Sequence, residues 1–257
     1  MARKPAPKTA FKPSAGSGGD APVSGASDVT TGWVTLITGL AVCLFLYIIN
    51  HDRNRHMGFF EYNAINTAFV LWVPLLVGMY GLRRSPENIG FGTGDLGKGT
   101  IVALICFALF TPIIYYFAAY PDPQAYYLSW MNGSGAVQQI YSNGKGGFVG
   151  GRIDPMGLLF HELIMGFYMF GWEFFFRGFL LSGLQKIMPF WGAVLLHAAL
   201  FTGLHIGKPL AETLSSFPGA VLMALIAVRY KSFLPCFLLH WLVSAGFDFA
   251  VLYHYFK

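Results

Sequence analysis

Charged residues are scarce in this sequence. Only 11% of its 257 residues are Asp, Glu, Lys or Arg, whereas soluble domains average about 25%. Hydrophobic residues make up 55% of the chain and aromatic residues 17%. This composition argues against one or two soluble domains and predicts a single membrane-embedded bundle.

Cysteines are few as well, and each lies in an apolar segment: Cys43, Cys106 and Cys236. Their spacing forms neither a disulfide framework nor a zinc-binding pair. The net charge of +5 does not indicate a nucleic-acid partner. Much of it lies in the N-terminal segment and in short loops, where Lys and Arg set the orientation in a membrane.

The N-terminal segment differs from the rest of the chain. Residues 1–30 are rich in Ala, Pro, Ser, Gly and Lys and show no hydrophobic periodicity, which predicts a disordered tail. A cleaved signal peptide is not predicted, because the first apolar run begins only near Gly32 and no small-residue cleavage site follows it. Residues 31–257 are predicted to form one transmembrane domain.

Long apolar runs follow this tail. A membrane-spanning helix needs about 20 apolar residues, and the sequence predicts an all-α polytopic bundle with about seven transmembrane helices. The fourth run would extend roughly 50 Å as one helix, so it must tilt, kink or protrude from a hydrocarbon core of ~30 Å. The runs lie near 32–50, 64–82, 100–120, 156–188, 190–206, 211–229 and 232–252.

Lys and Arg in the connecting segments predict the orientation. With the N-terminus inside and seven spans, ten of these residues fall on the inner side and six on the outer side. The excess favours an N-inside topology. The inner set is Arg3, Lys4, Lys8, Lys12, Arg83, Arg84, Lys98, Lys186, Arg229 and Lys231.

Ionisable residues within the apolar runs are the candidate functional groups. A charge at the bilayer centre costs about 2.5–3.5 kcal/mol on insertion scales, so such side chains usually face the bundle interior. Glu173 and Arg177 are one helical turn apart and can meet on one helix face. Two interpretations stay open for them, a structural ion pair and a functional group. The other candidates are His161, Glu162, His197, His205, His240 and Asp248.

Histidines on the next runs favour the functional interpretation. His205 lies at the end of one run and His240 lies in another. If these helices converge with Glu173, one carboxylate and two imidazoles can polarise a water molecule and stabilise an oxyanion. The same three side chains could alternatively hold a metal ion.

Three short motifs on successive runs resemble a known family. WEFFFR (172–177), FTGLH (201–205) and HWLVS (240–244) are similar to the EExxxR, FxxxH and HxxxN/D motifs of the CPBP family. This family comprises CAAX-type prenyl endopeptidases, bacteriocin-processing proteins and related bacterial intramembrane glutamic proteases. The resemblance covers roughly residues 156–250. It implies cleavage of a membrane-anchored or membrane-proximal protein substrate, with no cofactor and no metal, in a bacterial cytoplasmic membrane.

Carried onto this chain, the resemblance assigns catalytic roles. Glu173 acts as general base on water with help from His205, and Arg177 keeps Glu173 ionised and oriented. His240 stabilises the oxyanion together with Ser244, which stands where the family has Asn or Asp.

The first glutamate of the family motif is Trp172 here. Adjacent helical positions point about 100° apart, so Glu173 cannot replace that glutamate without a local distortion. Trp172 either walls the cavity or marks lost activity, and a catalytically inactive relative that binds and regulates a membrane partner is the alternative function.

The segment HELIM (161–165) fails as a zinc-protease motif because HExxH requires a second histidine where this chain has Met165. A solvated interfacial acid is the favoured interpretation of Glu162. A structural hydrogen bond is favoured for His197. Asp248 is left open between a partner on a neighbouring helix and the membrane surface.

Overall fold

The computed structural model describes residues 26–51, 57–138, 141–142 and 148–257. Most of the predicted N-terminal tail, residues 1–30, lies outside the described residues. The first helix, α1 (Asp28–His51), begins within the last part of that range. Ser27 caps it, since its hydroxyl oxygen accepts a hydrogen bond from the Thr30 backbone N–H at 3.1 Å.

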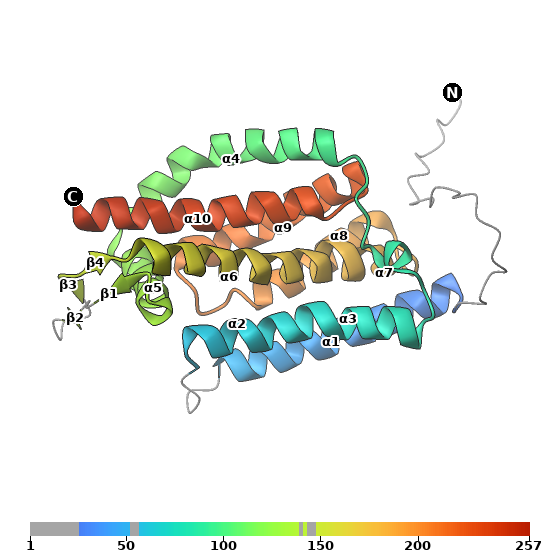
Figure 1. Cartoon of the computed structure of the whole chain (residues 1–257). Helices are drawn as coiled ribbons and strands as arrows, with labels where there is room; N and C mark the ends of the chain where they lie inside the picture. Colours follow the sequence, from blue (N-terminus) through green and yellow to red (C-terminus); the bar gives the residue numbers. More distant parts are fainter. Residues whose placement is uncertain (1–25, 52–56, 139–140, 143–147) are drawn as a thin grey trace, which may run out of the picture.

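Long helices that lie roughly side by side form the body of the molecule (Figure 1). They bury a common core that includes Phe174, Phe175, Phe176 and Phe179. The described helical elements are α1, α2 (Phe59–Thr67), η1 (Ala68–Trp72), α3 (Val73–Leu76), η2 (Val77–Gly81), η3 (Pro86–Ile89), α4 (Leu96–Ala118), α5 (Pro121–Ser134), α6 (Pro155–Glu173), η4 (Phe174–Leu180), α7 (Leu181–Leu184), α8 (Phe190–Gly203), α9 (Leu210–Tyr230) and α10 (Leu234–Phe256).

Within the described part of the chain, five helical segments are long and apolar enough to cross a membrane: α1, the run from α2 to η2, α4, α9 and α10. Large apolar side chains on their outer faces are exposed, among them Ile37, Leu44, Leu104, Leu109 and Phe249. Apolar surface of this extent is typical of contact with lipid. The chain is therefore a polytopic helical membrane protein.

The other two predicted spans also fold as helices but differ from these five. The predicted run 156–188 is a continuous helix through α6, η4 and α7, and it carries the buried Glu162, Glu173 and Arg177. The predicted run 190–206 corresponds to α8, which has only 14 residues. Five of the seven predicted spans thus have the length and composition of complete membrane crossings.

The segment between α4 and α6 lies at the end of the bundle where the chain terminates (Figure 1). It contains α5 and two antiparallel pairs of short strands, β1 (Val137–Gln138) with β4 (Arg152–Ile153), and β2 (Tyr141–Ser142) with β3 (Phe148–Val149). Asp154 then caps α6, because its carboxylate accepts hydrogen bonds from two backbone N–H groups of the first turn. This cap fixes the first residue of α6 and hence how far along the bundle its polar residues lie.

Candidate active site

Glu173 is the centre of a buried polar contact between two helices. It is the last residue of α6 and its side chain is fully buried. Its Oε1 accepts a hydrogen bond from Arg177 Nη1 at 3.0 Å and another from His240 Nδ1 of α10 at 2.6 Å. The carboxylate thus receives two donors, one from its own chain segment and one from a residue 67 positions away.

The π-helical segment η4 begins directly after Glu173 and contains Arg177. Such segments interrupt the regular α-helical turn and are frequent at functional sites. Arg177 is buried, and its Cζ lies 4.2 Å from the centroid of the Phe201 ring. The guanidinium is therefore held between the Glu173 carboxylate and the face of an aromatic ring, which attracts cations.

Phe201 connects the two histidines of the site. Its ring centroid lies 4.4 Å from that of His205 and 5.9 Å from that of His240. The Nδ1–H of His205 donates to the Phe201 carbonyl oxygen at 2.8 Å. Because a neutral imidazole has one N–H, this bond leaves Nε2 of His205 as an unprotonated acceptor.

Trp172 fills the space beside this histidine. The indole is buried, stacks on Phe176 with ring centroids 5.4 Å apart, and turns its edge toward His205 at 6.4 Å. Trp172, His205 and His240 line a cavity of about 10 Å³. That volume holds roughly one water molecule.

A larger cavity of about 440 Å³ lies on the other side of the two histidines. His205, His240 and Ser244 belong to its polar wall together with Tyr127, Glu212, Ser215 and Ser216. Apolar side chains of α4, α9 and α10 form most of the rest. Glu173 lines neither this cavity nor the small one. His240 therefore links the buried Glu173–Arg177 pair to the large cavity, and His205 joins the site through the Phe201 ring.

A third cavity, of about 50 Å³, is walled by α2, α5, α6 and α10, by the first turn of α9 and by the segment before it. On its wall, Lys208 Nζ donates to Glu212 Oε1 at 2.7 Å, and the Tyr127 hydroxyl donates to Glu212 Oε2 at 3.0 Å. Burial disfavours the charged form of Lys208, but the nearby Glu212 carboxylate outweighs it and raises the pKa of Lys208 above its ordinary value. Burial raises the pKa of Tyr127 as well.

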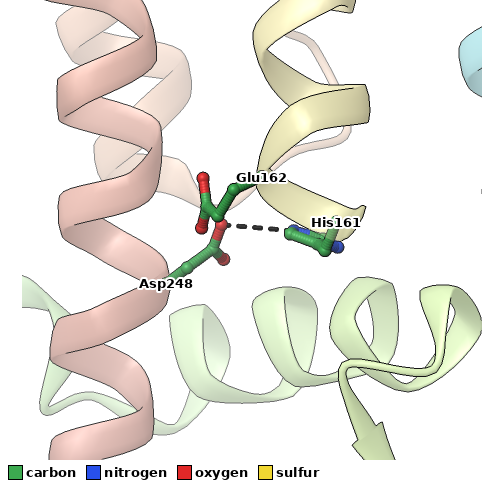
Figure 2. A group of neighbouring side chains, drawn as sticks. All are labelled: His161, Glu162 and Asp248. Atoms are coloured by element: carbon green, nitrogen blue, oxygen red, sulfur yellow. Dashed lines mark hydrogen bonds and ion pairs between the residues drawn. The ribbon is translucent and has the colours of Figure 1, made fainter. Parts of the chain in front are cut away.

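The prediction that Glu162 is a solvated interfacial acid is wrong. Glu162 is only 9% exposed, and together with His161 and Asp248 it forms a buried group between α6 and α10 (Figure 2). Asp248 follows Ser244 and His240 at intervals of four residues along one face of α10. That spacing is the sequence signal that could have placed Asp248 inside the bundle.

Two further expectations concern metal binding and His197. Among the described residues, Glu173, His205 and His240 do not form a group whose ligand atoms converge as a metal site requires. His197 is fully buried on α8, and its Nδ1–H donates to the Val194 carbonyl oxygen at 3.2 Å. The predicted structural hydrogen bond of His197 is confirmed.

Residues 156–246 match the family model described as type II CAAX prenyl endopeptidase Rce1-like. The chain carries an Rce1-like domain. This agrees with the resemblance inferred from the three motifs, all of which lie within the matched residues. No curated protein and no solved structure matches the chain. The Rce1-like domain includes Glu173, Arg177, His205, His240 and Ser244, whereas Asp248 lies just beyond it.

Proposed function

We propose that this protein is an intramembrane endopeptidase that hydrolyses a peptide bond of a membrane-anchored or membrane-proximal protein. The Rce1-like domain supports this proposal, because its family consists of membrane proteases. The observation that carries it is the common wall formed by His205 and His240 in one cavity of about 440 Å³. A peptide bond held in that cavity would meet both imidazoles.

The proposed base is His205. Its Nε2 is an unprotonated acceptor and can take a proton from a water molecule as the water oxygen bonds to the substrate carbonyl carbon. When the C–N bond breaks, the same nitrogen returns the proton to the leaving amine. The small cavity beside Trp172 has room for about one water molecule next to His205.

His240 and Ser244 are proposed to stabilise the oxyanion. His240 donates through Nδ1–H to Glu173 at 2.6 Å, and when its second ring nitrogen also carries a hydrogen, the Nε2–H can donate to the developing oxyanion. Ser244 lies one turn further along α10 on the cavity wall and can donate its hydroxyl hydrogen. In this proposal Glu173 and Arg177 are positioning residues, since they touch His240 and the Phe201 ring rather than the cavity.

The walls of the large cavity indicate the kind of substrate. Phe110, Ile113 and Phe117 of α4 and Leu222 of α9 are among the apolar side chains that surround it. Apolar walls favour a lipid-modified or hydrophobic peptide segment, because burial of apolar surface drives its binding. The proposed substrate is therefore a protein held at the bilayer by a lipid or by a hydrophobic segment.

The test uses the full chain in proteoliposomes with two probes, a farnesylated peptide ending in a CAAX sequence and a set of single-span peptides. Mass spectrometry reads the products. We expect cleavage by the wild type and a loss of about 100-fold or more in His205→Ala, since general acid–base groups typically contribute 10²–10⁴-fold. We expect a similar loss in His240→Ala, since removal of one oxyanion-hole donor typically costs about 10²–10³-fold. His197→Ala is the matched control, because this buried histidine of α8 lines none of the three cavities. Unchanged cleavage in both His205→Ala and His240→Ala, at equal incorporation, contradicts the proposal.

Trp172 favours a second candidate function, a catalytically inactive relative that binds and regulates a membrane partner. Its indole stands where the family motif has a glutamate, and it leaves only about 10 Å³ beside His205. In that case the wild type cleaves neither probe but still binds the single-span peptides. Protection of Ser215→Cys, on the wall of the large cavity, from a thiol reagent by the bound peptide measures this binding.

We also propose a topology. The Asp28 carboxylate binds Arg84 at 3.2 Å and Lys186 at 2.6 Å, so these two basic residues share one end of the bundle. The N–H of Asp95 donates to the carbonyl of Tyr230, next to Arg229 and Lys231. An end rich in Lys and Arg faces the cytoplasm.

The proposal therefore places this basic end and the N-terminus inside a bacterial cytoplasmic membrane. The run α6–α7 and α8 complete seven membrane-embedded segments. Labelling of single-cysteine variants from each side tests this topology. A cysteine near Lys98 that reacts only from outside contradicts it.

A further inference from the structure

His161, Glu162 and Asp248 converge between α6 and α10 (Figure 2). One nitrogen or carboxylate oxygen from each residue lies within 4.8 Å of the others, and His161 Nε2 lies 3.3 Å from Asp248 Oδ2. His161 is 1% exposed and Asp248 is 2% exposed. Glu162 precedes Glu173 by 11 residues, or about three helical turns, so this group is separate from the site proposed for peptide hydrolysis.

A hydrogen-bond chain determines which ring nitrogen of a neutral His161 carries the hydrogen. The Ser134 hydroxyl donates its single hydrogen to the Met131 carbonyl oxygen at 2.9 Å. Its oxygen must therefore accept from His161 Nδ1–H, which lies 2.8 Å away. A neutral His161 then has a lone pair on Nε2, and this lone pair faces a carboxylate oxygen of Asp248. Two acceptors this close repel one another unless a positive charge or a proton lies between them.

Glu162 adds a second carboxylate to the group. Both of its oxygens are buried without a hydrogen-bond partner of normal geometry among the described residues, and the donor beside them is the neutral indole N–H of Trp241. A buried carboxylate without a partner carries a high cost in free energy. The cation on the wall of the neighbouring cavity, Lys208, already pairs with Glu212 at 2.7 Å. With His161 neutral, the group therefore combines two carboxylates and one imidazole lone pair, and the described residues around it supply no other unpaired cation.

We propose that His161, Glu162 and Asp248 bind a divalent transition-metal ion such as Zn²⁺ or Mn²⁺. One divalent ion balances the charge of two carboxylates and a neutral imidazole, which removes the cost of burying them. Imidazole and carboxylate are ligands that such ions take, with bonds of about 2.0–2.2 Å. The observed separations reach that geometry with small side-chain movements.

The surroundings of the site match those of bound metals. A metal-ligating histidine almost always donates its other ring N–H to an oxygen, and Ser134 of α5 accepts this bond from His161. Three protein ligands leave a fourth position for water. A cavity of about 50 Å³ lined by His161 and Asp248 lies beside them. The ion would join α6 to α10, the two helices that also supply Glu173 and His240.

Metal content of the full chain in detergent tests this proposal. The protein is dialysed against EDTA, loaded with Zn²⁺ or Mn²⁺, freed of excess metal and analysed by mass spectrometry of the elements. We expect one ion per chain. Asp248→Asn and Glu162→Gln preserve side-chain size and should weaken binding by at least about 100-fold, while Ser134→Ala should weaken it by about 10- to 100-fold.

Two controls locate the ion. Glu212→Gln removes a carboxylate from the same cavity wall but not from the group, and it should retain one ion. His240→Ala tests binding at the proposed hydrolytic site and should also retain it. A wild type that binds no ion, equal binding in folded Asp248→Asn, or loss only in His240→Ala overturns the proposal. If the carboxylate variants do not fold, the wild-type content and the Ser134→Ala affinity decide. The readout does not depend on proteolysis, so it stands apart from the proposed function.

Discussion

Replacement of Glu173 by Gln should destabilise the protein strongly, because it leaves Arg177 as a buried charge without a counterion. Both side chains are fully buried, and among the described residues Glu173 is the carboxylate within ion-pair distance of Arg177. Two further guanidinium nitrogens, Nε and Nη2, are buried without a hydrogen-bond partner in the described part of the chain. The Glu173 carboxylate thus provides most of the electrostatic compensation for the buried charge of Arg177.

The size of the effect follows from these contacts. Removing one partner of a buried ion pair typically costs about 3–5 kcal/mol. The Phe201 ring, 4.2 Å from Arg177 Cζ, retains part of the compensation, since a desolvated cation–π contact contributes up to about 2 kcal/mol. We therefore expect Glu173→Gln to lower the free energy of unfolding by about 3 kcal/mol.

A double-mutant cycle measures this coupling. The four proteins are the wild type, Glu173→Gln, Arg177→Met and the double variant, each unfolded in detergent and followed by tryptophan fluorescence. The double variant removes both charges, and replacing a buried pair by apolar groups is often close to neutral. It should be more stable than Glu173→Gln by at least about 1 kcal/mol. Additive losses would refute the claim that Arg177 depends on Glu173. The cycle also separates loss of folding from loss of catalysis in any assay of Glu173→Gln.

Three other substitutions give separate tests. Gly90→Ala should lower the free energy of unfolding by about 2–5 kcal/mol, since Gly90 has φ +92° and a Cβ there would clash with the Gly178 carbonyl oxygen of η4. The unfolding midpoint measures this loss, and Gly97→Ala is the control, because a Cβ at Gly97 meets no atom within 4 Å. Tyr127→Phe removes a hydroxyl hydrogen bond to the Glu212 carboxylate and should lower the free energy of unfolding by about 1.5–3 kcal/mol in the same assay. An unchanged unfolding midpoint would contradict this prediction. Trp172→Glu should raise the rate of peptide cleavage at least about 10-fold, because it places a carboxylate beside the small cavity of His205 and a general base contributes up to about 10²–10⁴-fold. Equal cleavage rates in folded Trp172→Gln and Trp172→Glu would contradict this prediction.

Much of the fold could be predicted from the sequence because the membrane imposes a simple rule. A run of about 20 apolar residues must form a helix, since lipid cannot satisfy backbone hydrogen bonds. All seven predicted runs are helical in the structure, from α1 to α10. The shortness of α8 was not predicted, because the apolar run continues to Ile206 although the helix ends at Gly203.

The depth and partners of the polar side chains were harder to predict. Local spacing places Arg177 one turn from Glu173, and the structure has this contact at 3.0 Å. That His240 also binds Glu173 depends on the register of α10 against α6, which local spacing does not contain. The same register buries Glu162, so the expectation of a solvated acid was wrong.

The sequence by itself determined the helical membrane architecture, the resemblance to a protease family and the order of the motif residues, because these depend on composition and on spacing within one helix. Only the tertiary structure decided that Glu173 reaches the large cavity through His240 and does not line it itself. It alone also brought Asp248 to His161, 87 residues away. Helix packing sets such contacts, since side chains on different helices meet only where both helices turn the same face to one another.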